Sequence, residues 1–528
     1  MQKSRFNRQT TGLFTDQQNQ LAYKQDELLP FIGHTFSKEN FKKQIQEKGR
    51  SYSAKQREAL CLALKDKYSQ VEQSAKVKNN IEILHRDNSF TVTTGHQLSI
   101  FTGPIYLIYK IIHVIRLTEE LKKEYPENNF VPVYWMASED HDFEEIQSVE
   151  VFNKKLTWET EQKGPVGRFD TAGLEKVKLE ILSFFKNQPE SEIEEWLASY
   201  SGKNLSDATF NMIHYLFNAY GLLIVDGDNQ GLKRNFIPVI EKELKEQFSY
   251  HAVTKTNESI SKEGLKIQVN AREINLFYIG DNFRERIIAD EEGFFIEGKR
   301  RFTLDEIIGE LHEFPERFSP NVILRPVFQE VIMPKLCYVG GVGEISYWLQ
   351  LKGVFDAIEL PFPMIQPRTS ILWIDSALSK KLSKANISLE NLFLDVSQIK
   401  NQYLKEFAAD EVDFSALNSK FEEFKMVLKE RINNIDNNLN QYGQAEIVRM
   451  EKQIDGIKDK LVKTVKQRHD NAMKTIDQVF EKLFPNGGMQ ERSLNVISLC
   501  NDGKIKEKIN NLYTVIDPFN PDFLIIQE

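Results

Sequence analysis

A strand–turn–helix–strand pattern between residues 89 and 136 constrains the fold of this chain more than any other feature. Ser89–Thr94 and Phe130–Met136 are short runs rich in β-branched and aromatic residues. Between them, the turn Gly95-His96-Gln97 leads to a long apolar segment that begins at Pro104 and predicts a helix. Proline is tolerated in a first helical turn, because its missing N–H has no intrahelical partner there. The pattern is typical of a βαβ unit, so it predicts an α/β core with a parallel sheet and a right-handed crossover.

Polar residues follow both predicted strands. Thr94, Gly95, His96 and Gln97 end the first, and Ser138–Asp142 follows the second. The carboxyl ends of neighbouring parallel strands lie at one edge of a sheet, where ligands of such folds bind. We therefore expect the two loops to face a shared crevice.

His96 lies between the first strand and a predicted helix that is opened by Thr102-Gly103-Pro104. Helix N-termini present unpaired N–H groups and a positive dipole end, which suit phosphate, so Gly103 is a candidate for nucleotide binding. His96 could donate to a phosphate oxygen there. The alternative is a histidine that makes one structural hydrogen bond in a tight turn.

The second loop is acidic, with the sequence Glu139-Asp140-His141-Asp142-Phe143-Glu144-Glu145. Its carboxylates could bind Mg²⁺ or orient a substrate amine, which makes Asp140, His141 and Asp142 candidate catalytic residues. The alternative is an acidic helix N-terminus, which would suit Glu144 and Glu145. Zinc is disfavoured, because the HExxH and cysteine spacings of tetrahedral zinc sites are absent from this loop.

A glycine-rich segment, Gly340-Gly341-Val342-Gly343-Glu344, follows the predicted strand Lys335–Val339. Its spacing matches neither GxGxxG nor a P-loop. Gly341 and Gly343 would let a ligand approach the backbone closely. Glu344 could hold an α-amino group or be an ordinary acid at a helix start, and Tyr347 in the next turn is a further candidate.

Arg325 and Arg368 each stand at the end of a predicted extended segment, the first of which is Val322–Leu324. Arginine pairs bidentately with carboxylate or phosphate. Either residue could bind substrate, or could be one of the many arginines found on protein surfaces.

Two heptad series follow in a stretch that lacks proline from residue 368 to 484. The first runs from Phe414 to Leu439 and the second from Ile447 to Leu483, with Gly443 between them. They predict an antiparallel coiled-coil hairpin, and Arg468 and His469 interrupt its second seam.

The expected organisation is N-terminal helices and the first half of the core (1–150), an inserted subdomain (151–320), the second half of the core (321–395), the hairpin (396–485) and a segment that packs back on the core (486–528).

Composition limits the function classes. A formal net charge of −9 disfavours nucleic acid as a partner, because binding phosphate backbones normally needs a cationic surplus. Three scattered cysteines fit a reducing compartment, and we expect Cys337 to be a buried core residue. Neither a secretory signal nor a run of about 20 apolar residues is visible, so we expect a cytoplasmic protein without a membrane partner.

Taken together, the segments resemble the bacillithiol biosynthesis cysteine-adding enzyme family. Those that carry the resemblance lie in the family's order: Thr94–Pro104 (TGHQLSIFTGP), Val133–Glu145 (VYWMASEDHDFEE), Ser319–Pro326 (SPNVILRP), Tyr338–Leu349 (YVGGVGEISYWL), Pro367–Ser370 (PRTS) and Phe484–Val496 (FPNGGMQERSLNV). The chain departs from the family at His96, where the family often has glutamine. The resemblance implies a Rossmann-like core with inserted connecting-peptide regions, and a coiled coil used for homodimerisation.

The resemblance also implies the reaction, in which the carboxylate of cysteine is joined to the glucosamine amine of glucosaminyl malate. A free carboxylate needs activation, so we expect ATP, or binding of ADP or another nucleotide, with Mg²⁺ as a candidate companion, at Gly95 and His96. Asp140, Asp142 or Glu344 could hold an amine, and Arg325 or Arg368 could meet the malate carboxylates. Two other interpretations remain: a nucleotide-binding scaffold that recruits partners through its coiled coil, and nucleotidyl transfer onto RNA, which the acidic balance disfavours.

Overall fold

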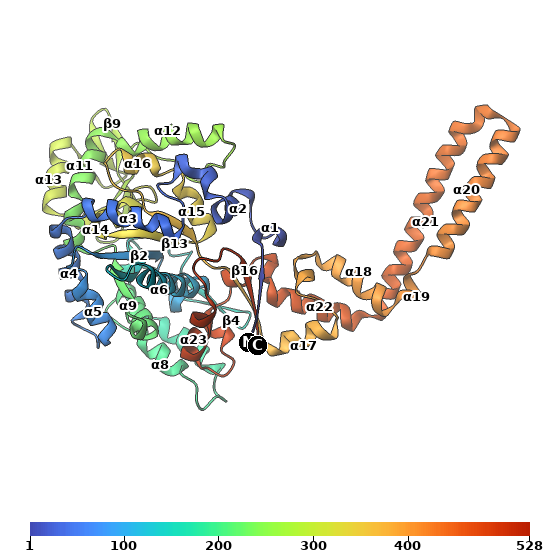
Figure 1. Ribbon diagram of the computed structural model, residues 1–528, viewed down its shortest axis with the longest axis horizontal. Helices are drawn as coiled ribbons and strands as arrows, with labels where there is room; N and C mark the ends of the chain where they lie inside the picture. Colours follow the sequence, from blue (N-terminus) through green and yellow to red (C-terminus); the bar gives the residue numbers. More distant parts are fainter. The chain divides into compact units, whose positions relative to one another are not determined.

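The computed structural model describes residues 1–528, apart from the side chain of residue 437. The chain forms two compact units (Figure 1). One contains Gln2–Trp373 and Met489–Ile526, and the other contains Ile374–Gly488 with Met1 and the last two residues. Among the described helices, none combines the length and the apolar character that crossing a bilayer requires.

A five-stranded parallel sheet forms the centre of the first unit, as the βαβ pattern predicted. Its strand order is β14-β13-β2-β3-β6, and every pairing is parallel. The order runs outward from β2 through β3 to β6, then returns to the other side of β2 with β13 and β14. The point of reversal therefore lies between β2 and β13, which is where open α/β sheets bind ligands. The strands are β2 (Ser89–His96), β3 (Asn129–Met136), β6 (Leu223–Asp226), β13 (Lys335–Gly340) and β14 (Met364–Pro367).

Helix α6 (Tyr106–Glu124) links β2 to β3 and is buried along most of its length. Nearly every residue of β2 and β3 is also buried, as expected for strands covered on both faces. The other main helices of this unit are α2 (Asp16–Tyr23), α3 (Lys38–Ser51), α4 (Ala54–Tyr68), α5 (Ala75–Ile83), α7 (Leu174–Ser183), α8 (Ile193–Ser199), α9 (Leu205–Phe217), α10 (Gln230–Lys233), α11 (Ile237–Glu246), α12 (Phe248–Lys262), α13 (Leu304–Glu313), α14 (Arg325–Ile332), α15 (Val342–Trp348), α16 (Lys352–Asp356) and α23 (Ile505–Val515).

Short sheets surround this core. One joins β1 (Gln2–Phe6), β16 (Phe523–Gln527) and β15 (Ile371–Ile374), so it combines segments from both ends of the sequence with the middle of the chain. The remaining strands are β4 (Ser148–Val151), β5 (Lys154–Thr157), β7 (Leu276–Ile279), β8 (Arg284–Arg286), β9 (Ile288–Asp290), β10 (Gly293–Ile296), β11 (Arg300–Phe302) and β12 (Phe318–Pro320).

One local prediction was wrong, and one of the alternatives is excluded. Val322–Leu324 is not a strand, because the Asn321 side chain accepts the backbone N–H groups of Ile323 and Leu324 and turns the chain into α14. Arg325 therefore starts a helix. Residues 143–147 form a turn into strand β4, so Glu144 and Glu145 do not begin a helix. In addition, β6 lies within residues 151–320, which were expected to form an inserted subdomain, yet it is an edge strand of the central sheet.

The second unit contains the predicted hairpin. Its long helices are α20 (Ser415–Ile435) and α21 (Asn440–Arg468), followed by α22 (Asp470–Leu483); α17 (Ser376–Lys384), α18 (Val396–Phe407) and α19 (Ala409–Val412) precede them. Lys425 of α20 forms an ion pair with Glu451 of α21 at 2.8 Å. A Cβ on Gly443 would lie 2.4 Å from the Ile432 side chain, so glycine lets the two helices approach at their turn. The helix breaks at His469, where the heptad series is interrupted.

The first unit also contains a buried cluster of charges. Glu330 lies between the ammonium groups of Lys48 and Lys335, and all three side chains are almost completely buried.

The chain leaves this unit after Trp373 and returns at Met489. The neighbouring Gln490 accepts the Trp373 N–H and donates to the Trp373 carbonyl, both at 3.0 Å. Cys61, Cys337 and Cys500 are all buried, as predicted for Cys337.

Candidate active site

A cavity of about 510 Å³ opens at the point where the strand order reverses. The loops after β2 and β3 both line it, which confirms that they face one crevice. Ten of the predicted site residues are on its wall: Gly95, His96, Gln97, Asp140, Arg325, Gly341, Gly343, Glu344, Tyr347 and Arg368.

Two predicted residues lie elsewhere and are structural. Thr94 donates its hydroxyl to the Val339 carbonyl at 2.7 Å inside the sheet. Gly103 has a φ of +59°, and a Cβ there would come within 2.4 Å of Ser99. The turn before α6 is covered by the C-terminal segment, because Asn495 donates to the Gly103 carbonyl and the Leu494 carbonyl accepts the N–H of Ile105. The N–H groups of Gly103 and Ile105 are bonded to the carbonyls of Ile100 and Leu494, so they are not available to the phosphate that was expected at this helix start.

A buried lysine, which the sequence analysis missed, organises the cavity wall. Lys110 of α6 donates to the Gly95 carbonyl at 2.9 Å and to the Glu344 carboxylate at 2.6 Å. Glu344 also accepts hydrogen bonds from the Tyr338 hydroxyl and the Gly341 N–H. A charge in the middle of the apolar helix IYLIYKIIHVIRL was the signal that could have identified Lys110.

Gly95 is required by this arrangement. A Cβ at this position would lie 3.0 Å from the Tyr338 hydroxyl and 3.4 Å from the Trp135 ring. The missing side chain lets Tyr338 lie against the end of β2, where it can reach Glu344.

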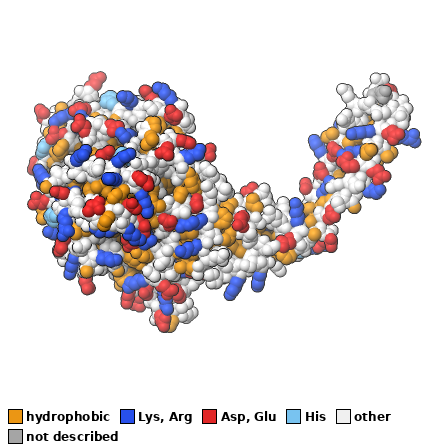
Figure 2. Space-filling model, in the orientation of Figure 1, with side chains coloured by type: hydrophobic (Ala, Val, Ile, Leu, Met, Phe, Trp, Pro, Cys, Tyr) orange, Lys and Arg blue, Asp and Glu red, His pale blue; other side chains and the backbone are white. Residues whose placement is uncertain are grey.

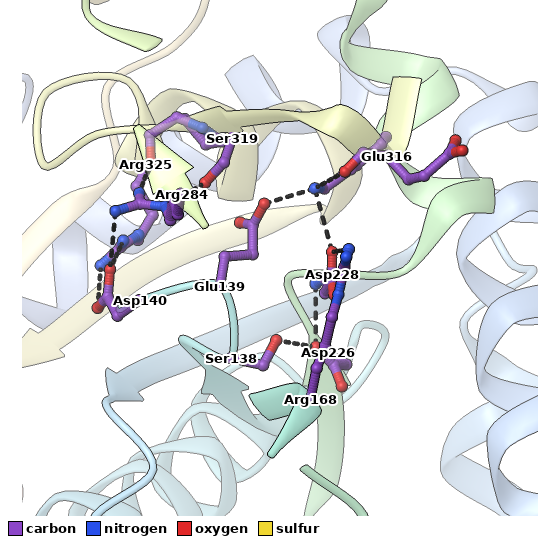
Figure 3. Close-up of polar contacts among 12 residues, drawn as sticks. Ser138, Glu139, Asp140, Arg168, Asp226, Asp228, Arg284, Glu316, Ser319 and Arg325 are labelled. Carbon is purple, nitrogen blue, oxygen red and sulfur yellow. Dashed lines mark hydrogen bonds and ion pairs between the residues drawn. The ribbon is translucent and has the colours of Figure 1, made fainter. Parts of the chain in front are cut away.

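An arginine pair holds Asp140 on the opposite wall. Arg325 donates to both oxygens of the Asp140 carboxylate, and Arg284 lies 3.8 Å from it (Figure 3). Arg284 is fixed in turn by the Ser319 hydroxyl and the Pro320 carbonyl. Burial alone would raise the pKa of Asp140, but the two arginines outweigh it and hold that pKa below its usual value. The Asp140 carboxylate is therefore ionised and paired with the two arginines. It is a poor general base, because its affinity for a proton is lowered.

His141 and Asp142 line an adjoining cavity of about 430 Å³ that shares Gln97, Asp140 and Arg325 with the first. We call it the arginine chamber, because its wall also includes Arg272, Arg284 and Arg286. The Nδ1 of His141 lies 3.1 Å from Arg284. A guanidinium can only donate, so Nδ1 is an acceptor and the imidazole is neutral. Burial and Arg284 lower the pKa of His141, in agreement with that assignment.

Arg368, on the cavity wall, is paired with Glu491 at 2.7 Å and donates to the Thr369 carbonyl. The next residue of the C-terminal segment, Arg492, is exposed at the cavity mouth and makes no ion pair with any described residue. Sequence reasoning missed Arg492, since only the fold brings residue 492 to the end of β2.

Family models match the whole chain. Residues 1–369 match the N-terminal Rossmann-like domain of bacillithiol biosynthesis BshC, and residues 371–528 match its C-terminal coiled-coil domain. The chain belongs to the bacillithiol biosynthesis BshC family. It is a ligase with a Rossmann-like domain and a coiled-coil domain, as the sequence predicted.

Three relatives, each named "Putative cysteine ligase BshC", show how far the similarity to other BshC proteins extends. The protein of Flavobacterium johnsoniae is 41% identical over 92% of both chains. That of Cytophaga hutchinsonii is 41% identical over 88% of this chain and 87% of its own. That of Flavobacterium psychrophilum is 39% identical over 98% of both chains.

His96 is neutral in this structure. Burial, followed by the nearby Lys110 and Arg368, lowers the pKa of His96 to about 3. Its Nε2 lies 3.3 Å from the Tyr106 hydroxyl. The imidazole therefore contributes hydrogen bonds to this BshC site but no positive charge.

The variant His96→Gln is expected to retain activity within about threefold, because glutamine can also donate and accept hydrogen bonds. The pH dependence of kcat/KM between pH 5.5 and 8 should be unchanged, since a group with a pKa of about 3 does not titrate in that range. Steady-state rates across this pH range provide the measurement. A limb near pH 6.5 that disappears in the variant would contradict the assignment.

Proposed function

We propose that this ligase joins the carboxylate of cysteine to the amine of glucosaminyl malate, and that ATP activates the carboxylate. The names of the relatives support cysteine as a substrate. Activation requires a nucleotide, because a free carboxylate does not form an amide at neutral pH. The acyl carbon would then pass from the activated oxygen to the amine nitrogen, with loss of phosphate or AMP.

The observation that carries the proposal is the cavity at the strand-order reversal, which has both signs of charge on its wall. Four cations line it (Lys110, Arg325, Arg368 and Arg492) against two carboxylates, Asp140 and Glu344. This excess of positive charge suits phosphate and carboxylate groups. The open backbone at Gly343, where a Cβ would meet nothing within 4 Å, leaves room for a ligand beside it.

The excess of positive charge on the cavity wall fits the phosphates of ATP. Arg492, at the mouth, is the one cation of this wall that has no carboxylate partner among the residues described. No group of three or more His, Cys, Asp and Glu side chains in the described part of the chain is arranged to hold a metal ion. Mg²⁺ would therefore arrive with ATP, held mainly by phosphate oxygens and water, as is usual for this ion.

The proposal is tested with purified protein, cysteine, glucosaminyl malate and ATP, with products separated and weighed by mass spectrometry. The expected product has the mass of the two substrates minus one water, and it forms only when all three reactants are present. ATP turnover that depends on cysteine without a cysteinyl product would contradict the proposed acceptor. Absence of product with every nucleoside triphosphate would contradict the ligation itself.

We also propose that the coiled coil forms a homodimer. The hairpin exposes large apolar side chains, and Figure 2 shows such residues among its charges; those more than 45% exposed include Phe424, Met426, Val427, Ile435 and Ile457. Large apolar side chains that are exposed in this number on one hairpin favour a partner surface that covers them. The double variant Phe424→Glu/Ile457→Glu is expected to elute with the mass of a monomer in light scattering, whereas the parent protein elutes as a dimer. A dimer in both samples would contradict the proposal.

A further inference from the structure

The arginine chamber adjoins the main cavity. Gln97, Asp140 and Arg325 line both spaces, so the two cavities share part of their walls. Its volume of about 430 Å³ lies within the range of sites for small molecules, roughly 300–1,000 Å³.

Most of the charges on these walls are already neutralised inside the protein. Arg325 is paired with Asp140, and Arg284 with Asp140 and His141. Outside the chamber, Arg368 is paired with Glu491. The two arginines that the sequence suggested for the malate carboxylates, Arg325 and Arg368, are therefore already occupied.

Three charges on the chamber wall have no such partner. The guanidinium groups of Arg272 and Arg286 form no ion pair or hydrogen bond with any residue that the structure describes, and neither does the Asp142 carboxylate. Glu145, also on this wall, accepts a hydrogen bond from Gln97. Because Gln97 is neutral, this bond leaves the Glu145 charge uncompensated, so the chamber offers two cations and one anion without any partner among the residues described, and a second anion that is held by an amide.

The backbone holds both free arginines in place. Arg286 belongs to β8 and lies opposite Phe277 of β7 in an antiparallel pairing. The N–H of Arg272 donates to the Asn275 side chain at 3.1 Å, and Asn275 is itself buried. Both guanidinium groups are therefore carried by anchored segments.

We infer that the arginine chamber binds an acceptor that carries two carboxylates and one ammonium group, with Arg272 and Arg286 on the carboxylates and Asp142 on the ammonium. The inference rests on the proposed function, because glucosaminyl malate has this set of charges. It identifies these residues as determinants of acceptor specificity. The acceptor's amine then lies beside Asp142 in the chamber.

Calorimetric titration of the full-length protein with three ligands tests the inference. L-malate carries only the two carboxylates, methyl glucosaminide carries only the ammonium, and glucosaminyl malate carries both. The variants are Arg272→Gln, Arg286→Gln, their double variant and Asp142→Asn. Arg234→Gln is the matched control, because Arg234 is exposed and lacks an ion pair within the described chain.

Each arginine substitution is expected to lower the affinity for L-malate and for glucosaminyl malate by about tenfold, because charge-assisted hydrogen bonds are lost. The double variant is expected to lower both affinities by about a hundredfold. Affinity for methyl glucosaminide should be unchanged in these variants. Asp142→Asn should lower the affinity for methyl glucosaminide and for glucosaminyl malate, and it should leave the affinity for L-malate unchanged. Circular dichroism establishes that each variant is folded.

Unchanged dicarboxylate affinity in the double variant would overturn the inference, and so would an equal loss in Arg234→Gln. If the protein binds L-malate through the two arginines but does not bind glucosaminyl malate, the dicarboxylate site stands and the proposed acceptor is wrong. Failure to bind either dicarboxylate would overturn the chamber's role, while the ligation assay separately reports on the reaction.

Discussion

Replacement of Asp140 by asparagine is expected to lower kcat/KM for ligation by at least about a hundredfold. Asparagine cannot neutralise Arg325 and Arg284, which meet on this carboxylate. The loss of one partner of a buried ion pair leaves an uncompensated charge. The guanidinium groups would then shift towards another anion, and small displacements of positioning groups are known to cost about a hundredfold in rate. Steady-state kinetics with each substrate varied in turn provide the measurement.

The matched control for Asp140→Asn is Asp281→Asn, at an exposed acid in the turn between β7 and β8. This control should retain the rate of the parent protein. Circular dichroism at the assay temperature distinguishes an unfolded protein from a folded protein with a disturbed site. A folded Asp140→Asn variant with activity within threefold of the parent would show that the arginine pair does not need this carboxylate.

Replacement of Glu330 by glutamine is expected to lower the free energy of unfolding by about 3–5 kcal/mol, the usual cost of breaking a buried ion pair. Glu330 is the only carboxylate paired with the buried Lys48 and Lys335 among the residues described. Burial already lowers the pKa of Lys335 to about 8, although Glu330 opposes the shift. Removing the carboxylate would leave two ammonium groups close together in a dry environment. Urea unfolding followed by fluorescence measures the effect.

Two comparisons make the Glu330 experiment specific. Glu313→Gln, at an exposed acid of α13 that has no ion pair in the described structure, should change stability by less than about 0.5 kcal/mol. The triple variant Lys48→Met/Glu330→Leu/Lys335→Met should recover most of the loss, because well-packed apolar residues often replace buried charges without cost. A Glu330→Gln variant as stable as the parent would contradict the prediction, because it would mean that the charges of Lys48 and Lys335 do not depend on Glu330 for neutralisation.

The central fold was predictable because its signals are local. The two strands, the glycine turn and the crossover helix lie within fifty residues, and the heptad series is continuous in sequence. The strand predicted at Val322–Leu324 failed because a single side chain, Asn321, captures two backbone N–H groups and starts a helix. Apolar content alone could not distinguish the two outcomes.

The site was predictable only in part, for a related reason. The polar strand ends could be placed together, because parallel strands end at one edge of a sheet. The state of each side chain depends on distant partners, however. Arg284, which is 143 residues from His141, makes that imidazole an acceptor, and Asn495 occupies the turn where phosphate was expected. Such pairings leave no pattern in a single sequence.

The double hydrogen bond between Trp373 and Gln490 has a consequence for how this protein can change. The chain leaves the Rossmann-like unit after Trp373 and re-enters it at Met489, and the side chain of Gln490 bonds these two crossing points to each other. The segment between them can therefore change in length without changing the distance that the Rossmann-like unit sets between its exit and its entry. An engineer can replace that segment by a short linker and measure ligation by the Rossmann-like unit without the coiled coil.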